Sequence, residues 1–204
     1  MIPPRIYLAS RSPRRRELLH QIGVQFDLLT FRSGERGEDA DVDETPLGNE
    51  DAERYVTRVA LTKAESGVRR LGWRQLTRRP VLSADTTLEL DGRIIGKPKD
   101  AVDANRILAS LGGRRHRVLT AVALSDGEHT RYRLNISEVQ FRALDEDEIR
   151  RYVASGESLD KAGGYGIQGR AAMFVQEIHG SYSGIMGLPL FETAALLKEF
   201  DYPI

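Results

Sequence analysis

The sequence predicts an α/β fold with a mixed sheet, formed by a single domain of residues 1–204. Two segments of alternating apolar residues turn at Asp-Gly pairs, at residues 91–92 and 126–127, which is the strongest short signal for a β-hairpin. Other segments carry apolar residues at helical spacing and begin at capping residues. Hairpins mixed with helices favour a sheet with antiparallel pairs over successive βαβ units.

The first predicted helix has an unusual start. A short strand at residues 5–9 leads to Ser12, a predicted N-cap, and to Pro13 at the first helical position. Arginines at 14–16 occupy the first turn, where each cation opposes the helix dipole by about 0.3–1 kcal/mol. A helix start with free backbone N–H groups, flanked by Ser10, is expected to bind an anion. A solvated basic turn is the alternative.

The segment over residues 32–49 is polar and rich in glycine and acidic residues, so it is predicted to be a long loop. Its Glu44 could complete a metal site, although solvation is the interpretation that the pattern alone favours. A helix is expected next, with Asn49 as its cap and an apolar stripe that includes Lys63. A lysine on that stripe either extends to solvent, the more frequent case, or points into a cleft. Residues 71–79 are expected to be irregular.

The hairpin around residues 91–92 is the most informative stretch. It begins as an apolar strand in which Asp85 is costly unless it is paired, hydrogen-bonded or bound to a metal. The return strand leads to Lys97, so a local turn brings a carboxylate and a lysine near one another. A two-residue turn would pair Lys97 with Thr86, on the opposite face from Asp85, whereas a bulge or a longer loop would bring them together. A plain hairpin with a surface ion pair explains the stretch equally well.

The second half of the chain is predicted to contain helices, a hairpin and a glycine-rich loop. The expected elements are a helix from Asp100 to residues 112–113, a hairpin over 118–142 with a bulge between Ile136 and Val139, a helix from Asp145 to Gly156, a loop over 160–169, a strand over 171–178, and a final helix from Pro189 to about residue 200. The loop's glycines would let the backbone approach a ligand closely.

Composition excludes several classes of protein. The 30 basic and 30 acidic residues give a formal net charge of zero, which argues against a dedicated nucleic-acid binder. The chain has no cysteine, and therefore no disulfide, thiolate metal site or cysteine nucleophile. The N-terminus lacks the apolar run of a signal peptide, and no stretch is long enough to span a membrane. A cytoplasmic enzyme is therefore expected.

Two phosphate-binding motifs match only in part. Residues 92–97 resemble a Walker loop, but the segment is one residue short and Pro98 stands where Ser or Thr belongs. Residues 164–169 fit G-x-G-x-x-G, yet they follow a helix and loop and precede a predicted strand, which excludes a Rossmann site. The four histidines are scattered singly and show no metal-ligand spacing.

The remaining polar features form a coherent set. They are the arginine-rich helix start, an in-strand Asp85, two lysines, an acidic loop and a glycine-rich loop. Together they suit a polyphosphate bound with Mg²⁺, because the cation prefers carboxylate and phosphate oxygens while guanidinium and ammonium groups offset the remaining negative charge.

Several separate motifs, in order along the chain, resemble those of the Maf nucleotide pyrophosphatases. They are Ser10-Arg11-Ser12-Pro13-Arg14-Arg15, Val42-Asp43-Glu44, Ser83-Ala84-Asp85-Thr86 with Gly96-Lys97-Pro98, Asp160-Lys161-Ala162-Gly163 with Tyr165-Gly166-Ile167-Gln168-Gly169, and Gly187-Leu188-Pro189-Leu190. The resemblance implies an α/β fold of two lobes around a central cleft, shared with inosine-triphosphate pyrophosphatases. It also implies hydrolysis of a nucleoside triphosphate to the monophosphate and pyrophosphate, with a divalent cation, Mg²⁺ or Mn²⁺.

The resemblance further implies roles for individual residues. The implied catalytic residues are Asp85, Lys97, Arg15 and Lys63; the substrate-binding residues are Ser10, Arg14, Thr86 and Gln168; and the metal ligands are Glu44 and Asp85. A carboxylate with the ordinary Asp pKa of about 3.9 is a weak base, so orienting water beside a metal is easier than deprotonating it. The long acidic loop before Val42 and the presence of Arg11 depart from the family pattern.

Within that family, residues 165–169 are similar to the branch that acts on dTTP and UTP. Gln168 can donate and accept at once, which matches the carbonyl–imide edge of an unmodified pyrimidine. The alternatives are a 7-methyl-GTP pyrophosphatase of the same family and a non-catalytic, nucleotide-binding regulator of septum formation. The expected partner is a nucleoside triphosphate, with no membrane and no nucleic acid, and a homodimer is left open.

Overall fold

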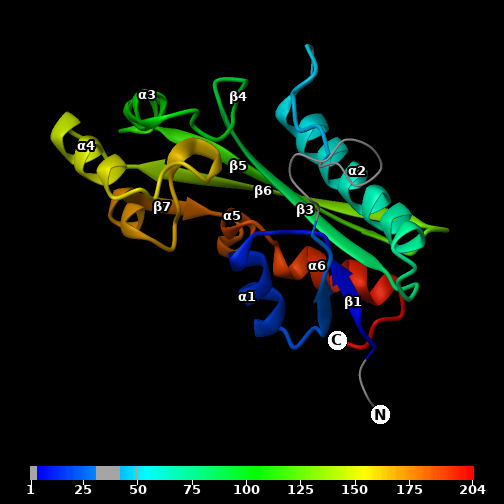
Figure 1. Ribbon diagram of the computed structural model, residues 1–204. Helices are drawn as coiled ribbons and strands as arrows, with labels where there is room; N and C mark the ends of the chain where they lie inside the picture. The colour runs from blue at the N-terminus through cyan, green and yellow to red at the C-terminus, as the bar shows by residue number, and fades with distance from the viewer. Residues whose placement is uncertain (1–3, 31–41, 49) are drawn as a thin grey trace.

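The computed structural model of this protein describes residues 4–30, 42–48 and 50–204 (Figure 1). Most of the predicted loop over residues 32–49 lies outside this part of the chain, and its described portion contains neither helix nor strand. No helix within the described ranges is both long enough and apolar enough to cross a membrane.

In the described part of the chain, seven strands form one mixed sheet of order β2-β1-β3-β5-β6-β7, with β4 paired to β3. The strands are β1 (Ile6–Leu8), β2 (Phe26–Leu28), β3 (Val81–Leu90), β4 (Arg93–Ile95), β5 (Arg115–Ser125), β6 (Thr130–Phe141) and β7 (Val175–His179). β1 is parallel to β2 and β3, and the other pairs are antiparallel. This confirms the predicted α/β fold with a mixed sheet and hairpins.

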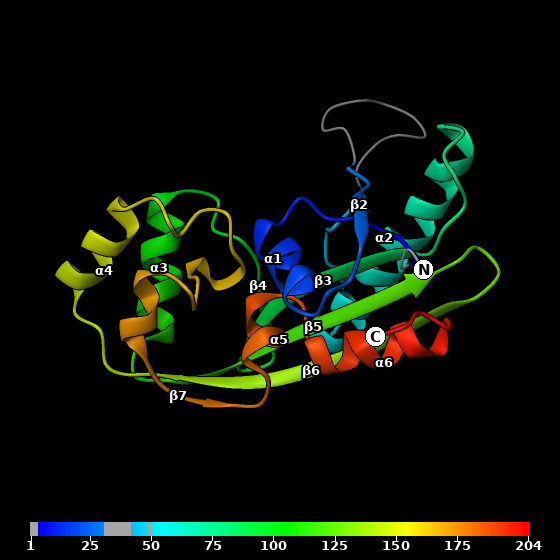
Figure 2. The same cartoon turned by 90° about the horizontal axis from the view of Figure 1, so that it is seen from below.

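Helices cover both faces of the sheet. α2 packs on β3, β5 and β6 from one side, and α6 packs on β5 and β6 from the other (Figures 1 and 2). The helices are α1 (Pro13–Gln21), α2 (Ala52–Trp73), α3 (Ala101–Leu111), α4 (Glu146–Ala154), α5 (Tyr182–Met186) and α6 (Leu190–Glu199), with 3₁₀ segments η1 (Ala162–Gly164) and η2 (Arg170–Phe174). Figure 2 shows α3 and α4 side by side, at the end of the sheet away from α6.

Two large apolar clusters lie toward opposite ends of the sheet. The first joins α1 and α6 to β1 and the start of β3, through buried residues that include Ile6, Leu8, Leu19, Leu82 and Leu196. The second joins α3 and α4 to the far end of β3, through residues that include Leu88, Leu108, Phe141, Tyr152 and Phe174. The polar residues in the middle of β3 therefore lie between two separate apolar cores.

The β3–β4 hairpin forms as predicted, and its end explains how Lys97 leaves the sheet. Asp91 (φ 53°) and Gly92 (φ 75°) both adopt the positive φ that this two-residue turn requires. Pairing with β3 ends at Ile95, so the chain departs from the ladder before Lys97. The extrapolated pairing of Lys97 with Thr86 does not occur, and Lys97 is free to approach the site from outside the sheet.

The prediction of a bulge between Ile136 and Val139 is wrong. β6 pairs with β5 without a break, and the one register shift occurs on the β7 side, at Gln140/Phe141. The apolar phase changes because different elements cover the two faces along the strand. Leu134 packs with the α2 cluster, whereas Val139 belongs to the α3–α4 cluster. The apolar periodicity of β6 therefore reflects which face of the strand is covered at each position, and it does not indicate a break in the strand pairing.

The long helix α2 differs from the prediction at both ends. It continues to Trp73, because Arg70 and Leu71 in its last turns are still buried, so only residues 74–79 of the predicted irregular segment are irregular. Its N-cap is Asp51, whereas the predicted cap, Asn49, lies outside the described residues. An Asp cap accepts a backbone N–H bond as an Asn cap would, so the helix start was displaced by two residues.

The strand predicted over residues 171–178 begins later than expected. Residues 170–174 form η2 instead, and β7 starts at Val175. Ala171 and Phe174 are both buried, and residues three apart share a face in a 3₁₀ turn. α5 lies between this strand and the final helix, where no helix was predicted.

Candidate active site

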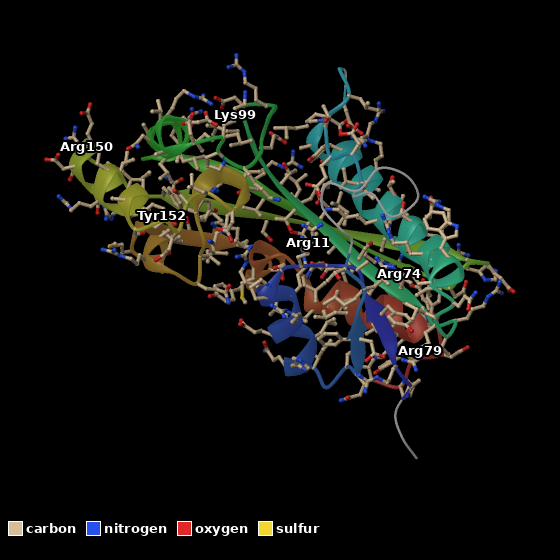
Figure 3. The ribbon with its side chains drawn as sticks, in the orientation of Figure 1. Arg11, Arg74, Arg79, Lys99, Arg150 and Tyr152 are labelled. Carbon is tan, nitrogen blue, oxygen red and sulfur yellow. The ribbon has the colours of Figure 1, made fainter. Side chains whose placement is uncertain are left out.

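A cavity of about 620 Å³ lies beside the middle of β3. All nine residues proposed from the sequence line it: Ser10, Arg14, Arg15, Glu44, Lys63, Asp85, Thr86, Lys97 and Gln168. Arg11, another lining residue, lies near the centre of the molecule in Figure 3, whereas Arg150 lies at the outer end of α4. The fold thus gathers side chains from six separate stretches of sequence.

The arginine-rich start of α1 faces this cavity, and Arg15 is its best-anchored member. The Arg15 Nε donates to the Gly187 carbonyl (2.7 Å), Nη2 donates to Thr86 Oγ1 (3.2 Å) and Nη1 donates to Ser10 Oγ (3.3 Å). Burial lowers the pKa of Arg15, and the nearby Asp85 carboxylate opposes that change. A guanidinium has five N–H groups, so two remain for an anion in the cavity.

Lys63 points into the cavity rather than extending to solvent, so the more frequent fate of such a lysine is not the one observed here. Its Nζ lies 2.9 Å from Asp85 Oδ1 and 2.5 Å from Glu44 Oε1, and the residue is 8% exposed. Glu44 comes from the acidic loop, and its ion pair with Lys63 shows that it is not merely solvated. Burial would raise the pKa of Glu44, but Lys63, Lys97 and Arg15 together hold it below its usual value.

Asp85 and Thr86 are consecutive residues of β3, and their side chains lie on opposite faces of the strand. Asp85 meets Lys63 on the α2 side, whereas Thr86 meets Arg15 and Thr120 on the other. Both residues line the cavity. Lys63 and Arg15 therefore contact β3 from opposite faces.

The glycine-rich segment forms a further wall of the cavity. The Gly163 N–H donates to the Gly96 carbonyl (3.0 Å), which ties the segment to the end of the central hairpin. Gln168 lines the cavity and is exposed. Arg14 Nη1 lies 3.9 Å from Asp160 Oδ2, so an ion pair joins the start of α1 to this segment.

The pair of Glu44 and Asp85 fits a site for a divalent cation. The two carboxylates already share one cation, the ammonium group of Lys63. Proteins commonly bind Mg²⁺ through one or two carboxylates, with water and phosphate oxygens completing the octahedron. Within the described residues, no three His, Asp or Glu side chains come together as a metal cluster.

Two contributors to the site were not predicted. Tyr55 lines the cavity, and its hydroxyl donates to the Glu44 carbonyl oxygen (2.9 Å), which holds the acidic loop against α2. Its spacing of eight residues from Lys63 on one helical stripe was a usable signal. The carbonyl oxygen of Gly187 binds Arg15 across 172 positions of sequence, for which no local signal exists.

Comparison with known proteins decides the family. The model of the Maf family, described as Maf-like protein, matches residues 5–200 of the chain. The chain belongs to the Maf family. Maf relatives cover it almost completely: a protein named dTTP/UTP pyrophosphatase from Aromatoleum aromaticum is 72% identical over all of this chain and 98% of its own length. Relatives with the same name from Dechloromonas aromatica and Chromobacterium violaceum are 58% and 49% identical, over 97% and 98% of the chain.

Proposed function

We propose that this Maf protein is a dTTP/UTP pyrophosphatase, which hydrolyses either nucleotide to the nucleoside monophosphate and pyrophosphate. The full-length similarity to the Aromatoleum aromaticum protein supports the substrate class. The single structural observation that carries the proposal is the cavity that brings Arg15, Lys63 and Lys97 together with the Glu44–Asp85 pair. Such a combination suits cleavage of a polyphosphate without a Walker loop.

In the proposed reaction, water attacks the α-phosphorus and pyrophosphate leaves. Asp85 would orient that water, and Glu44 and Asp85 would hold Mg²⁺ or Mn²⁺. When bound, the cation would supply Lewis-acid stabilisation of charge on the phosphate oxygens. Arg15, Lys97 and Lys63 would stabilise the charge that develops on the departing pyrophosphate. The placement of these three cationic side chains around one cavity supports this division of roles.

We also propose that Ser10 acts as a donor to phosphate. Its hydroxyl oxygen accepts from the Ser12 backbone N–H (3.2 Å) and from Arg15 Nη1 (3.3 Å). A hydroxyl has two lone pairs and one proton, so both acceptor positions are used and the proton remains. A phosphate oxygen accepts that proton well, whereas a substrate donor would find no partner there.

On this proposal, the two apolar clusters at opposite ends of the sheet are the cores of two lobes, and the cavity between them is the cleft. Arg14, Thr86 and Gln168 would contact the base. The exposed amide of Gln168 can both donate and accept, as the edge of thymine or uracil requires.

The test is hydrolysis by the purified full-length protein with Mg²⁺, using dTTP, UTP, CTP and 7-methyl-GTP separately. We expect pyrophosphate, not orthophosphate, as the primary product, and the highest kcat/KM with dTTP and UTP. Orthophosphate would place cleavage at the γ position and contradict the mechanism. A preference for 7-methyl-GTP would contradict the base assignment, and binding without turnover would favour the regulatory alternative.

A further inference from the structure

A directional chain of hydrogen bonds ends at the cavity. Arg15 Nη2 lies 3.2 Å from Thr86 Oγ1, which lies 2.9 Å from Thr120 Oγ1, which in turn lies 2.8 Å from the carbonyl oxygen of Gly184. Thr86 and Thr120 are directly opposite one another on β3 and β5, so the contact belongs to the sheet register. Thr120 is fully buried and does not line the cavity.

The protons in this chain have only one arrangement. A carbonyl oxygen has no proton, so the Thr120 hydroxyl must donate to Gly184. That donation uses the only proton of Thr120, so Thr86 must donate to Thr120 across their 2.9 Å contact. The guanidinium of Arg15 can only donate, so it uses one lone pair of Thr86. Thr86 therefore offers the cavity one lone pair and no proton.

We propose that Thr120 is a positioning residue that fixes Thr86 as a hydrogen-bond acceptor toward the nucleotide base. The inference rests on the proposed function. On the edge of thymine and uracil the one N–H donor is N3–H, whereas cytosine presents a bare N3 acceptor at the same place. When Thr86 can only accept, it forms a hydrogen bond with the N3–H of thymine or uracil. With cytosine, the lone pair of Thr86 would face the lone pair of N3, and no hydrogen bond would form. The network thus rejects cytosine nucleotides.

The ribose gives a competing explanation that the same experiment separates. If Thr86 accepted from a sugar hydroxyl, UTP and CTP would be affected equally, because their ribose is identical. Only a contact with the base edge makes the ratio of the two kcat/KM values depend on Thr120. That ratio, rather than activity itself, is therefore the informative measurement.

The main test compares kcat/KM for UTP and CTP in the wild type, Thr120→Val and Thr120→Ser. Val removes the acceptor that holds the Thr86 proton, so Thr86 can turn that proton toward cytosine N3. We expect the UTP-to-CTP ratio to fall about tenfold in Thr120→Val. Thr120→Ser keeps the hydroxyl and should retain the wild-type ratio. An unchanged ratio in Thr120→Val would overturn the proposal.

Two matched controls separate this effect from loss of a buried hydroxyl. Thr193 is fully buried in α6 and donates to the Pro189 carbonyl (2.7 Å), and neither residue lines the cavity. Thr193→Val should lower the melting temperature without changing the ratio. Ser10→Ala removes a phosphate-facing donor and should lower kcat/KM for UTP and CTP by the same factor. A ratio change in either control would contradict the assignment to Thr120.

A measurement on the wild-type protein keeps the test valid if Thr120→Val does not fold. The triphosphate of 3-deazauridine carries C–H in place of N3–H, and we expect its kcat/KM to be about tenfold below that of UTP. Equal rates would overturn the inference. Failure of the wild type to hydrolyse UTP at all would instead remove the proposed function, so the two failures are distinct.

Discussion

Asp85 is the side chain on which turnover should depend most. Asp85→Asn keeps the volume, and Lys63 keeps its second partner Glu44 at 2.5 Å, so the fold should be retained. We expect kcat with UTP to fall by about 10²–10⁴-fold, since a water-orienting or metal-binding carboxylate is lost. The measurements are kcat at saturating Mg²⁺ and the melting temperature.

The control for this variant is Glu89→Gln on the same strand. Glu89 pairs with Arg117 (2.6 Å) and does not line the cavity, so its neutralisation should leave kcat unchanged. Near wild-type turnover in Asp85→Asn would move the proposed role to Glu44.

The contribution of Arg15 to turnover should depend on the shape of its side chain as well as on its charge. Its guanidinium binds three partners from three separate parts of the chain, and a lysine ammonium has no planar fork to reproduce this. We expect Arg15→Lys to lower kcat about 10- to 100-fold with a smaller change in substrate affinity. The neighbouring Arg16 does not line the cavity, so Arg16→Lys should be neutral. If affinity alone falls, Arg15 holds phosphate only in the ground state.

Among the loops and turns, the glycine-rich segment has the most demanding packing. A Cβ at Gly163, where φ is 73°, would lie 2.2 Å from Leu88 Cδ2. We expect Gly163→Ala to reduce the free energy of unfolding by roughly 2–4 kcal/mol, through positive φ and overpacking together. Denaturant unfolding measures this.

Gly156 provides the matched control for that variant. It has φ of 80° but nothing within 4 Å of an added Cβ, so Gly156→Ala should cost only the backbone strain, roughly 1–2 kcal/mol. Equal losses in the two variants would show that contact with Leu88 contributes nothing.

The elements that the sequence predicted well carry local signals. The turn at Asp91 and Gly92 and the cap at Asp100 lie within the few residues that they organise, and both are observed. The helical pattern alone could not choose the pocket-facing orientation of Lys63, because it depends on Glu44 from a loop 19 positions away. Thr120 and Gly184 meet across 64 positions, which only the sheet register and α5 bring together.

For the molecule as a whole, His116 should make stability depend on pH. It is buried, its Nε2 lies 2.8 Å from the Tyr165 hydroxyl, and its ring meets Phe141 edge to face. Burial lowers the pKa of His116 to about 4, against an ordinary value of 6.5. The unfolded chain therefore binds the proton more readily, so stability is complete above pH 6.5 and is lost as the pH falls toward 4.

The predicted loss over that interval is about 3 kcal/mol in the free energy of unfolding. It is measured by denaturant unfolding between pH 7 and pH 4, in the wild type and in His116→Gln. The difference between the two proteins isolates His116 from the many surface carboxylates that also titrate. If the free energy of unfolding changed with pH in the same way in both proteins, His116 would not titrate in this range.

The placement of Asp85 next to Thr86 has one more consequence. Consecutive Cα atoms across a planar trans peptide are about 3.8 Å apart, so the backbone fixes the distance between these two Cα atoms. On the proposed roles, the carboxylate that acts at the cleavage point and the hydroxyl that contacts the base belong to consecutive residues of one strand. Motion of α1 or the glycine-rich segment therefore leaves the spacing of the two Cα atoms unchanged. A change of base preference at position 86 would leave the carboxylate where it is, so selectivity and turnover can evolve separately.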